Sequence, residues 1–215
     1  MSQKLQENKS YGKLAVLCGI LTVVFFCCYL FFSNRYAVEF LETTLLKKDM
    51  LEESTLSQMF NHLFVLFTVL FSGFLWQYFK RPGDEIFREA SSFYFLAYII
   101  LLLRTFIIVF QPESLPYILI AGIQILITSL GMLFFLITFL NDRKYLLMAI
   151  LTAFDMLGYL ASVIYSVFMA EFILPNLGSI LVAVTNISFL SAFLHRRMRQ
   201  NDLKNSYAAR QTLPE

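Results

Sequence analysis

Long apolar stretches, each about 20 residues in length, recur six times in the sequence. An α-helix rises about 1.5 Å per residue, so each stretch can cross the roughly 30 Å hydrocarbon core of a bilayer. Backbone polar groups in lipid need partners within the chain, and continuous apolar runs do not match the alternating strands of a barrel. The sequence therefore predicts an all-α fold, in which six transmembrane helices form one domain over residues 1–200. The predicted spans are approximately 13–33, 59–79, 91–111, 117–140, 145–170 and 177–194.

The composition agrees with this fold class, because 58% of the residues are hydrophobic and only 15% are charged. A soluble domain usually carries about 25% charged residues. We therefore expect the lipid bilayer to be the main partner of the chain, and we expect no nucleic-acid partner. The polar residues at the end of the chain, 201–215, predict a short disordered cytoplasmic tail beside the anionic inner leaflet.

Basic residues predict the orientation, because positively charged loops are retained on the cytoplasmic side of a membrane. If the N-terminus is cytoplasmic, 13 basic residues fall in cytoplasmic segments and 3 fall in outer segments. This bias predicts cytoplasmic N- and C-termini in a multi-pass protein of the cell membrane, with a bacterial inner membrane as the expected location. The predicted cytoplasmic helix ends also carry aromatic residues typical of an interfacial belt, namely Trp76, Tyr78, Tyr94 and Tyr145.

The loop that follows the first span is longer than a turn requires. It places Val38, Leu41 and Leu45 near helical spacing, with charged residues between them. This pattern predicts an outer amphipathic helix over approximately residues 36–56. Such a helix is either a connector that lies on the membrane surface or a lid over an outward-facing cavity.

Arg104 lies in the middle of the third apolar stretch, where a charged side chain costs about 2.5 to 3.5 kcal/mol on insertion scales. The other fully charged residue inside a span is Asp155. Counting from the predicted inner helix ends places Arg104 and Asp155 at similar depths, roughly 20 Å and 16 Å. The sequence therefore predicts that both side chains point inward and form a pair.

Polar and small residues recur at steps of three or four in the later spans, which places them on single helix faces. We expect these faces to converge on one polar interior. The five candidate ligand-binding residues in that interior are Arg104, Gln124, Asp155, Tyr159 and Asn186.

Two interpretations of this interior are open. In the structural one, Arg104 and Asp155 neutralise each other, and the remaining polar residues hold the helices together. In the functional one, the polar faces line an outward-facing cavity, where Arg104 and Gln124 bind a polar or anionic ligand and Asp155 balances charge.

The leading functional hypothesis is an integral membrane protein that binds a small polar or amphiphilic ligand, as a carrier component or a receptor-like subunit. The alternative is a structural or regulatory subunit that binds another membrane protein. Such a subunit is expected to expose a groove of small residues, for which Ala15, Gly19 and Thr22 are the candidates.

An enzymatic role is the least favoured hypothesis, although the sequence leaves it open. No Ser/His/Asp array, paired carboxylates within a span or phosphate-binding glycine loop can be recognised. No cofactor or metal is expected, because no Cys/His cluster has the spacing of metal ligands.

Two short motifs in the last two spans carry a resemblance to a known family. These are Gly158-Tyr159-Leu160 and Leu174-Pro175-Asn176. The segment resembles an uncharacterised bacterial family of six-helix membrane proteins, which also has a long outer loop after its first helix and an Arg in its third. In this chain the acid, Asp155, precedes the Gly-Tyr-Leu motif instead of following it. The resemblance implies a six-helix architecture and no particular activity.

Overall fold

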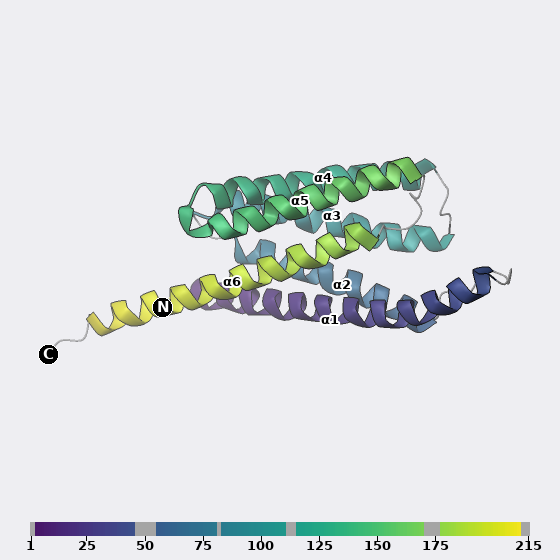
Figure 1. The fold of residues 1–215 in the computed structure, drawn as a ribbon. Helices are drawn as coiled ribbons and strands as arrows, with labels where there is room; N and C mark the ends of the chain where they lie inside the picture. Colours follow the sequence, from purple (N-terminus) through teal and green to yellow (C-terminus); the bar gives the residue numbers. More distant parts are fainter. Residues whose placement is uncertain (1–2, 46–54, 81–82, 111–114, 170–176, 212–215) are drawn as a thin grey trace.

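The computed structural model describes residues 3–45, 55–80, 83–110, 115–169 and 177–211. These residues form six α-helices and one short 3₁₀ turn, η1 (Arg143–Tyr145), so the prediction of an all-α fold is confirmed (Figure 1). The helices are α1 (Gln3–Leu45), α2 (Thr55–Tyr78), α3 (Glu85–Phe110), α4 (Leu115–Leu140), α5 (Leu146–Met169) and α6 (Leu177–Gln211).

Five of these helices, α1 to α5, are long and apolar enough to cross a membrane, as expected of a multi-pass membrane protein. The sixth predicted span, residues 177–194, coincides with the first half of α6.

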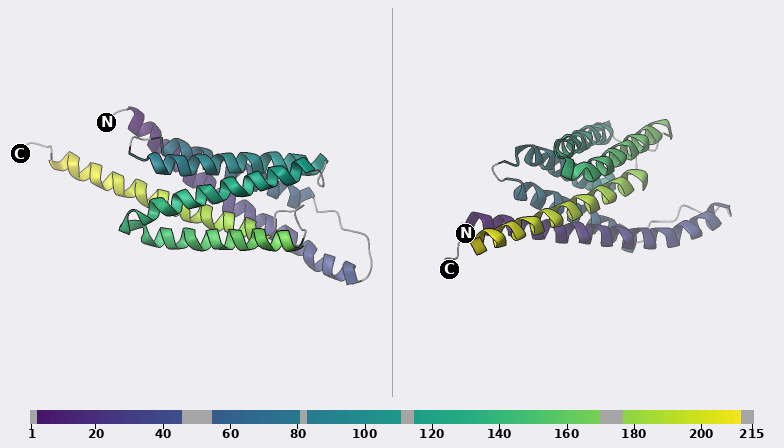
Figure 2. Two further views of the ribbon diagram at one scale, coloured as in Figure 1. Left: turned by 90° about the horizontal axis from the view of Figure 1, so that it is seen from above. Right: turned by 60° about the vertical axis from the view of Figure 1, so that its left-hand side comes forward.

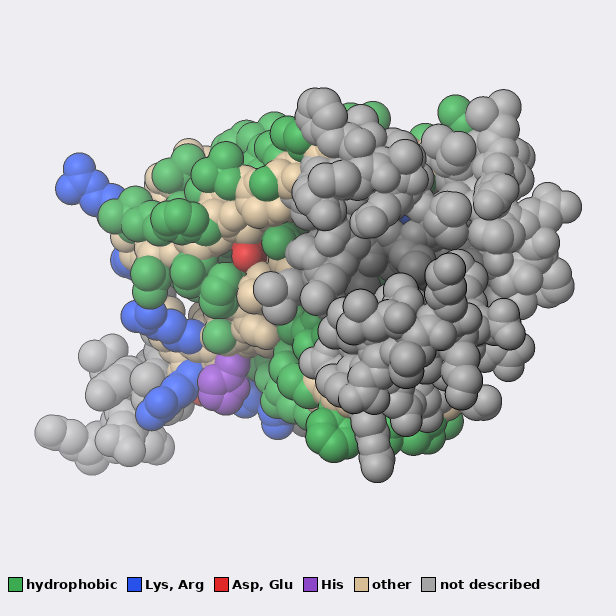
Figure 3. Space-filling view, turned by 45° about the vertical axis from the view of Figure 1, so that its right-hand side comes forward, with side chains coloured by type: hydrophobic (Ala, Val, Ile, Leu, Met, Phe, Trp, Pro, Cys, Tyr) green, Lys and Arg blue, Asp and Glu red, His purple; other side chains and the backbone are tan. Residues whose placement is uncertain are grey.

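The helices pack in chain order, and the last returns to the first. Each of α1 to α5 contacts the helix that follows it, and α6 also contacts α1 (Figures 1 and 2). The chain begins and finishes at the same end of the bundle, which we call the near end. Lys and Arg side chains gather toward this end, and hydrophobic side chains cover much of the remaining described surface (Figure 3).

The structure corrects the prediction of a separate outer helix. α1 continues without interruption to Leu45, so its 43 residues span roughly 65 Å, about twice the thickness of the hydrocarbon core. Residues 33–45 contain neither glycine nor proline, and therefore nothing in the local sequence ends the helix. The rest of the predicted outer helix, residues 46–54, lies outside the described residues.

The prediction of a disordered tail is also wrong, because α6 continues to Gln211. Residues 195–211 again lack glycine and proline and are rich in residues with favourable helix propensity. An ion pair joins this extension to the start of α1, with Lys9 Nζ 2.8 Å from Asp202 Oδ1. Both polar ends of the chain therefore extend the first and last helices at the near end.

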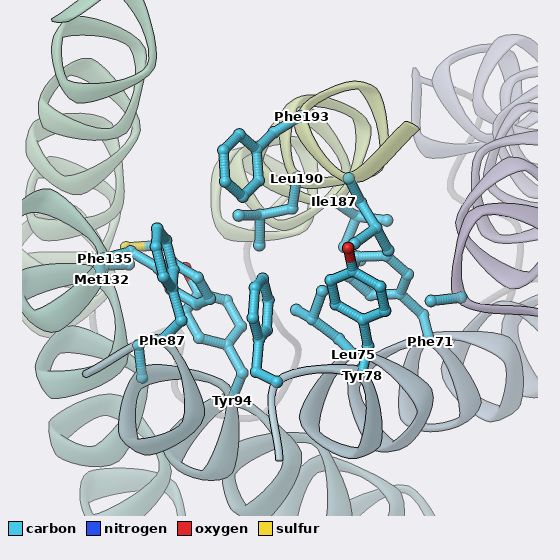
Figure 4. Close-up of a cluster of buried hydrophobic side chains, with 14 of the residues drawn as sticks. Phe71, Leu75, Tyr78, Phe87, Tyr94, Met132, Phe135, Ile187, Leu190 and Phe193 are labelled. Atoms are coloured by element: carbon cyan, nitrogen blue, oxygen red, sulfur yellow. The ribbon is translucent and has the colours of Figure 1, made fainter. Parts of the chain in front are cut away.

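Aromatic side chains fill much of the core between the helices (Figure 4). Phe87 of α3 stacks on Phe79 and on Phe193 of α6, with ring centroids 4.9 Å and 5.6 Å apart. Arg197 lies over both Phe79 and Phe87 and forms a largely buried ion pair with Asp84, which precedes α3. These contacts fix the end of α6 against the turn between α2 and α3.

Small residues allow α1 and α6 to approach closely. Ala15, Gly19 and Thr22 are buried, so the groove expected of a partner-binding subunit is closed within the bundle. A Cβ at Gly19 would clash with Ser191 Oγ and would lie 3.2 Å from Phe71 Cδ2. The face that the sequence suggests for an external partner is thus already occupied by the chain itself.

We expect Gly19→Leu to destabilise the protein by about 1–3 kcal/mol, because the added side chain overpacks the contact between α1 and α6. Gly122→Leu is the matched control, since a Cβ at that exposed position meets nothing within 4 Å. Thermal unfolding of both variants in the same detergent measures the difference. Equal midpoints would contradict the close contact between the two helices.

Candidate functional site

The five candidate residues are all buried, and they come from four neighbouring helices. Their exposed fractions are between 2% and 9%. α3 contributes Arg104, α4 contributes Gln124, α5 contributes Asp155 and Tyr159, and α6 contributes Asn186. The predicted convergence of polar helix faces on the interior therefore occurs, although the residues divide into two groups at different depths.

The first group surrounds Arg104, in the half of the bundle away from the chain termini. Arg104 Nη1 donates a hydrogen bond to Gln124 Oε1. One turn along α4, the Thr128 hydroxyl donates to the backbone carbonyl of Gln124 at 2.8 Å. Tyr159 interacts with Thr128 through a side-chain hydrogen bond and with Arg104 electrostatically. This group presents a guanidinium, an amide and hydroxyls to one small region.

The second group surrounds Asp155, closer to the near end. Asp155 Oδ1 accepts a hydrogen bond from the Thr185 hydroxyl at 2.8 Å, and its Oδ2 accepts one from Asn186 Nδ2 at 3.3 Å. Both donors are neutral. The ion pairs among the described residues join other side chains, namely Lys9 to Asp202, Arg88 to Glu89 and Arg197 to Asp84.

The predicted direct pair between Arg104 and Asp155 is therefore wrong, and the helix boundaries explain why. α3 begins at Glu85, six residues before the predicted start of the span, whereas α5 begins at Leu146, close to its predicted start. Arg104 consequently lies about 29 Å along α3 and Asp155 about 14 Å along α5. In the structure the two charges accordingly have different partners, Gln124 for Arg104 and Thr185 with Asn186 for Asp155.

Two tyrosines of α3, Tyr94 and Tyr98, lie beside the Asp155 group and are missing from the predicted site. Tyr98 interacts electrostatically with Tyr159 and Asp155, and Tyr94 lies beside Asn186. Neither the Tyr94 hydroxyl nor Asn186 Oδ1 makes a hydrogen bond of normal geometry within the described residues. The sequence places Tyr94 in an interfacial belt, but its side chain is fully buried. Tyr94 lies four residues before Tyr98, which places both on one face of α3, and this spacing could have identified them from the sequence.

Together these residues form a continuous polar column inside an apolar bundle. It has a guanidinium and an amide toward one end, hydroxyls in the middle, and a carboxylate with neutral donors toward the other. Among the described residues, no group of three His, Cys, Asp or Glu side chains is placed to hold a metal ion. We define the polar column as Arg104, Gln124, Thr128, Tyr159, Tyr98, Tyr94, Asn186, Asp155 and Thr185.

Comparison of the chain with protein-family models, with curated proteins and with solved structures gives no match. The resemblance to a bacterial six-helix family therefore stays a prediction. Gly158, Tyr159 and Leu160 lie on α5, and the Leu174-Pro175-Asn176 motif lies outside the described residues.

Double-mutant cycles can test the separation of the two charges. We expect Arg104→Met and Gln124→Leu to be coupled by about 0.5–3 kcal/mol, because these side chains share a hydrogen bond. Arg104→Met and Asp155→Asn are expected to be additive within about 0.5 kcal/mol, because the two charges lie at different depths. Free energies of unfolding in bicelles provide the measurement. Strong coupling between Arg104 and Asp155 would contradict their separation and support a direct pair.

Proposed function

We propose that the polar column binds a small polar or amphiphilic ligand, and that the protein acts as a carrier component or a receptor-like subunit in the cell membrane. The observation that carries this proposal is the environment of Asp155. Its carboxylate is 8% exposed and is bonded by the Thr185 hydroxyl and the Asn186 amide. Within the described residues it has no cation at ion-pair distance.

A purely structural role explains this arrangement poorly. A buried charge in a membrane protein is costly, and a helix interface can be held by neutral hydrogen bonds at much lower cost. Neutralisation by a cation would justify a carboxylate in the core, but within the described residues Asp155 is bonded by the neutral donors Thr185 and Asn186. Ionisable residues inside membrane spans usually mark ligand or ion pathways. The separation of these charges favours such a pathway over a packing role.

The positions of the groups suggest how a ligand would bind. The Arg104 guanidinium and the Gln124 amide are suited to an anionic or hydrogen-bond-accepting group. The Tyr98 and Tyr159 rings are suited to the apolar part, because each offers an apolar face and a hydroxyl. Asp155 would balance the charge of Arg104 across the column. The column thus has polar groups at its two ends and aromatic rings in its middle. This arrangement fits an amphiphilic molecule whose apolar part lies against the rings.

The second candidate function is that of a structural or regulatory subunit for another membrane protein. The small residues Ala15, Gly19 and Thr22 do not support it, because they are buried within the bundle. A partner would instead have to contact the large apolar side chains on the outer face of α1, such as Leu17, Ile20 and Val24. Exposed apolar residues of this kind also suit contact with lipid, so they do not favour a protein partner.

We further propose that α6 is the sixth span and that both termini are cytoplasmic. The gathering of Lys and Arg side chains at the near end supports this orientation (Figure 3). A reporter that is active only in the cytoplasm should be active when fused to either end of the chain. A reporter active only outside the cytoplasm should be active when inserted between residues 46 and 54. The reverse pattern would contradict the proposed orientation.

Native mass spectrometry of gently extracted protein can test the ligand site. We expect a mass of a few hundred daltons above the 25.0 kDa chain, identified by fragmentation as a molecule other than a phospholipid. Arg104→Ala should lower its occupancy by about tenfold or more, because a hydrogen bond to a charged group is lost.

The exposed Arg143→Ala variant controls for loss of charge, and Asp155→Asn preserves side-chain shape if Arg104→Ala folds poorly. An adduct that all three variants retain equally would place the ligand elsewhere. A bare wild-type chain would contradict the proposed function.

A further inference from the structure

An open hollow lies at the near end of the bundle, between the end of α2 and the start of α3. Its volume is about 500 Å³, and its lining combines two cationic side chains, one carboxylate, an indole ring and a hydroxyl. It is separate from the polar column, because none of its lining residues belongs to that set. The lining residues are Trp76, Lys80, Arg88, Glu89 and Ser92.

The charged groups of the hollow are a lysine held by an aromatic ring and an exposed ion pair. Lys80 Nζ lies 4.1 Å from the centre of the Trp76 ring, which holds the ammonium group on one side of the hollow. Arg88 Nη2 lies 3.3 Å from Glu89 Oε1, and the two side chains are 41% and 54% exposed. An exposed pair of this kind contributes little to stability and is available for a ligand. The hollow therefore offers two cations for an anion and one carboxylate for a cation.

The surroundings of the hollow indicate a lipid. α2 ends at Tyr78 and α3 begins at Glu85, so the hollow lies where two candidate spans emerge from the membrane. Beyond the charged rim, Trp76 stacks on Phe95 with ring centroids 5.6 Å apart, and Leu96 is exposed on the same helix. A ligand with a charged head and long apolar chains would match both the rim and the surface below it.

We propose that this hollow binds a zwitterionic phospholipid whose headgroup carries a phosphate and a primary ammonium group, as in phosphatidylethanolamine. Lys80 and Arg88 bind the phosphate, and Glu89 binds the ammonium group. Ser92 lines the same hollow, and because its hydroxyl donates to the backbone carbonyl of Glu89 at 2.7 Å, its oxygen can accept a hydrogen bond from the ammonium group. Arg88 is the cation that faces Glu89 in the structure, so a phosphate that engages Arg88 leaves the carboxylate without its partner. The ammonium group of a zwitterionic headgroup can replace that partner, whereas a headgroup with phosphate alone cannot, so the carboxylate selects the zwitterion. The proposal is independent of any ligand in the polar column.

The test compares phosphatidylethanolamine and phosphatidylglycerol with identical acyl chains, added in equal amounts to delipidated full-length protein and measured by native mass spectrometry. We expect the wild-type chain to retain phosphatidylethanolamine preferentially. Lys80→Gln with Arg88→Gln should reduce retention of both lipids by about tenfold, because the phosphate loses both charged donors. Glu89→Gln should abolish the preference by lowering retention of phosphatidylethanolamine and raising that of phosphatidylglycerol.

The matched control is Arg143→Gln with Lys144→Gln. This exposed basic pair lies at the same end of the bundle, beside Asp142 in the turn between α4 and α5, and outside the hollow. The control variant should retain the wild-type preference. Equal loss of lipid from the control and from the Lys80 and Arg88 variant would overturn the site, because general surface charge would then explain binding. A preference that survives Glu89→Gln would overturn the role of the carboxylate.

Soluble phosphoethanolamine separates a lipid from a free phosphate compound. We expect it to leave retention of phosphatidylethanolamine unchanged at equal concentration, because it lacks the chains that contact the surface beside Phe95 and Leu96. Displacement of the lipid by equimolar phosphoethanolamine would overturn the assignment to a membrane lipid and identify the hollow as a site for a soluble phosphate compound.

Discussion

Hydrogen bonding without water is the constraint on which the rest of this structure depends. In a hydrocarbon environment each backbone donor and acceptor needs a partner within the chain, and helices provide those partners locally. The same constraint acts on the polar side chains. Many hydroxyl groups along the helices donate a hydrogen bond to the backbone carbonyl one turn earlier. The residues that do so include Thr22, Thr68, Ser91, Thr128, Thr138 and Ser188. The charged and amide side chains of the polar column, Arg104, Gln124, Asp155 and Asn186, instead bond to side chains of neighbouring helices or of the same group.

The column differs from an ordinary helix interface in the way its charges are arranged. Arg104 bonds to the neutral amide of Gln124, and Asp155 is held by the neutral side chains of Thr185 and Asn186. Tyrosine side chains lie beside the two groups, where they provide hydroxyls without adding charge. A bundle that needed only adhesion between helices would not require charges at two depths. This arrangement of the charges is the basis of the ligand site proposed above.

Aromatic packing joins the helices at the near end of the bundle. Aromatic rings from α2, α3, α4 and α6 stack there, and Arg197 covers two of them while it pairs with Asp84. The same end carries the basic side chains and the charged hollow beside Trp76. Aromatic packing, positive charge and the hollow proposed to bind a lipid headgroup therefore coincide in one layer. This layer joins the helices at the near end, and the Asp155 end of the polar column lies closest to it.

The sequence by itself determined the all-α class, the positions of the apolar stretches and the burial of Arg104, Gln124, Asp155, Tyr159 and Asn186. These properties follow from local hydrophobicity and from the 3.6-residue period of a helix, which any window of the sequence carries. The tertiary structure alone decided which polar groups meet. The depth of a side chain depends on where its helix begins, and the early start of α3 moved Arg104 away from Asp155 and brought Tyr94 into the interior. The burial of Gly19 against α6 also depends on the return of the last helix to the first, and a contact between segments so far apart in the sequence has no local signature.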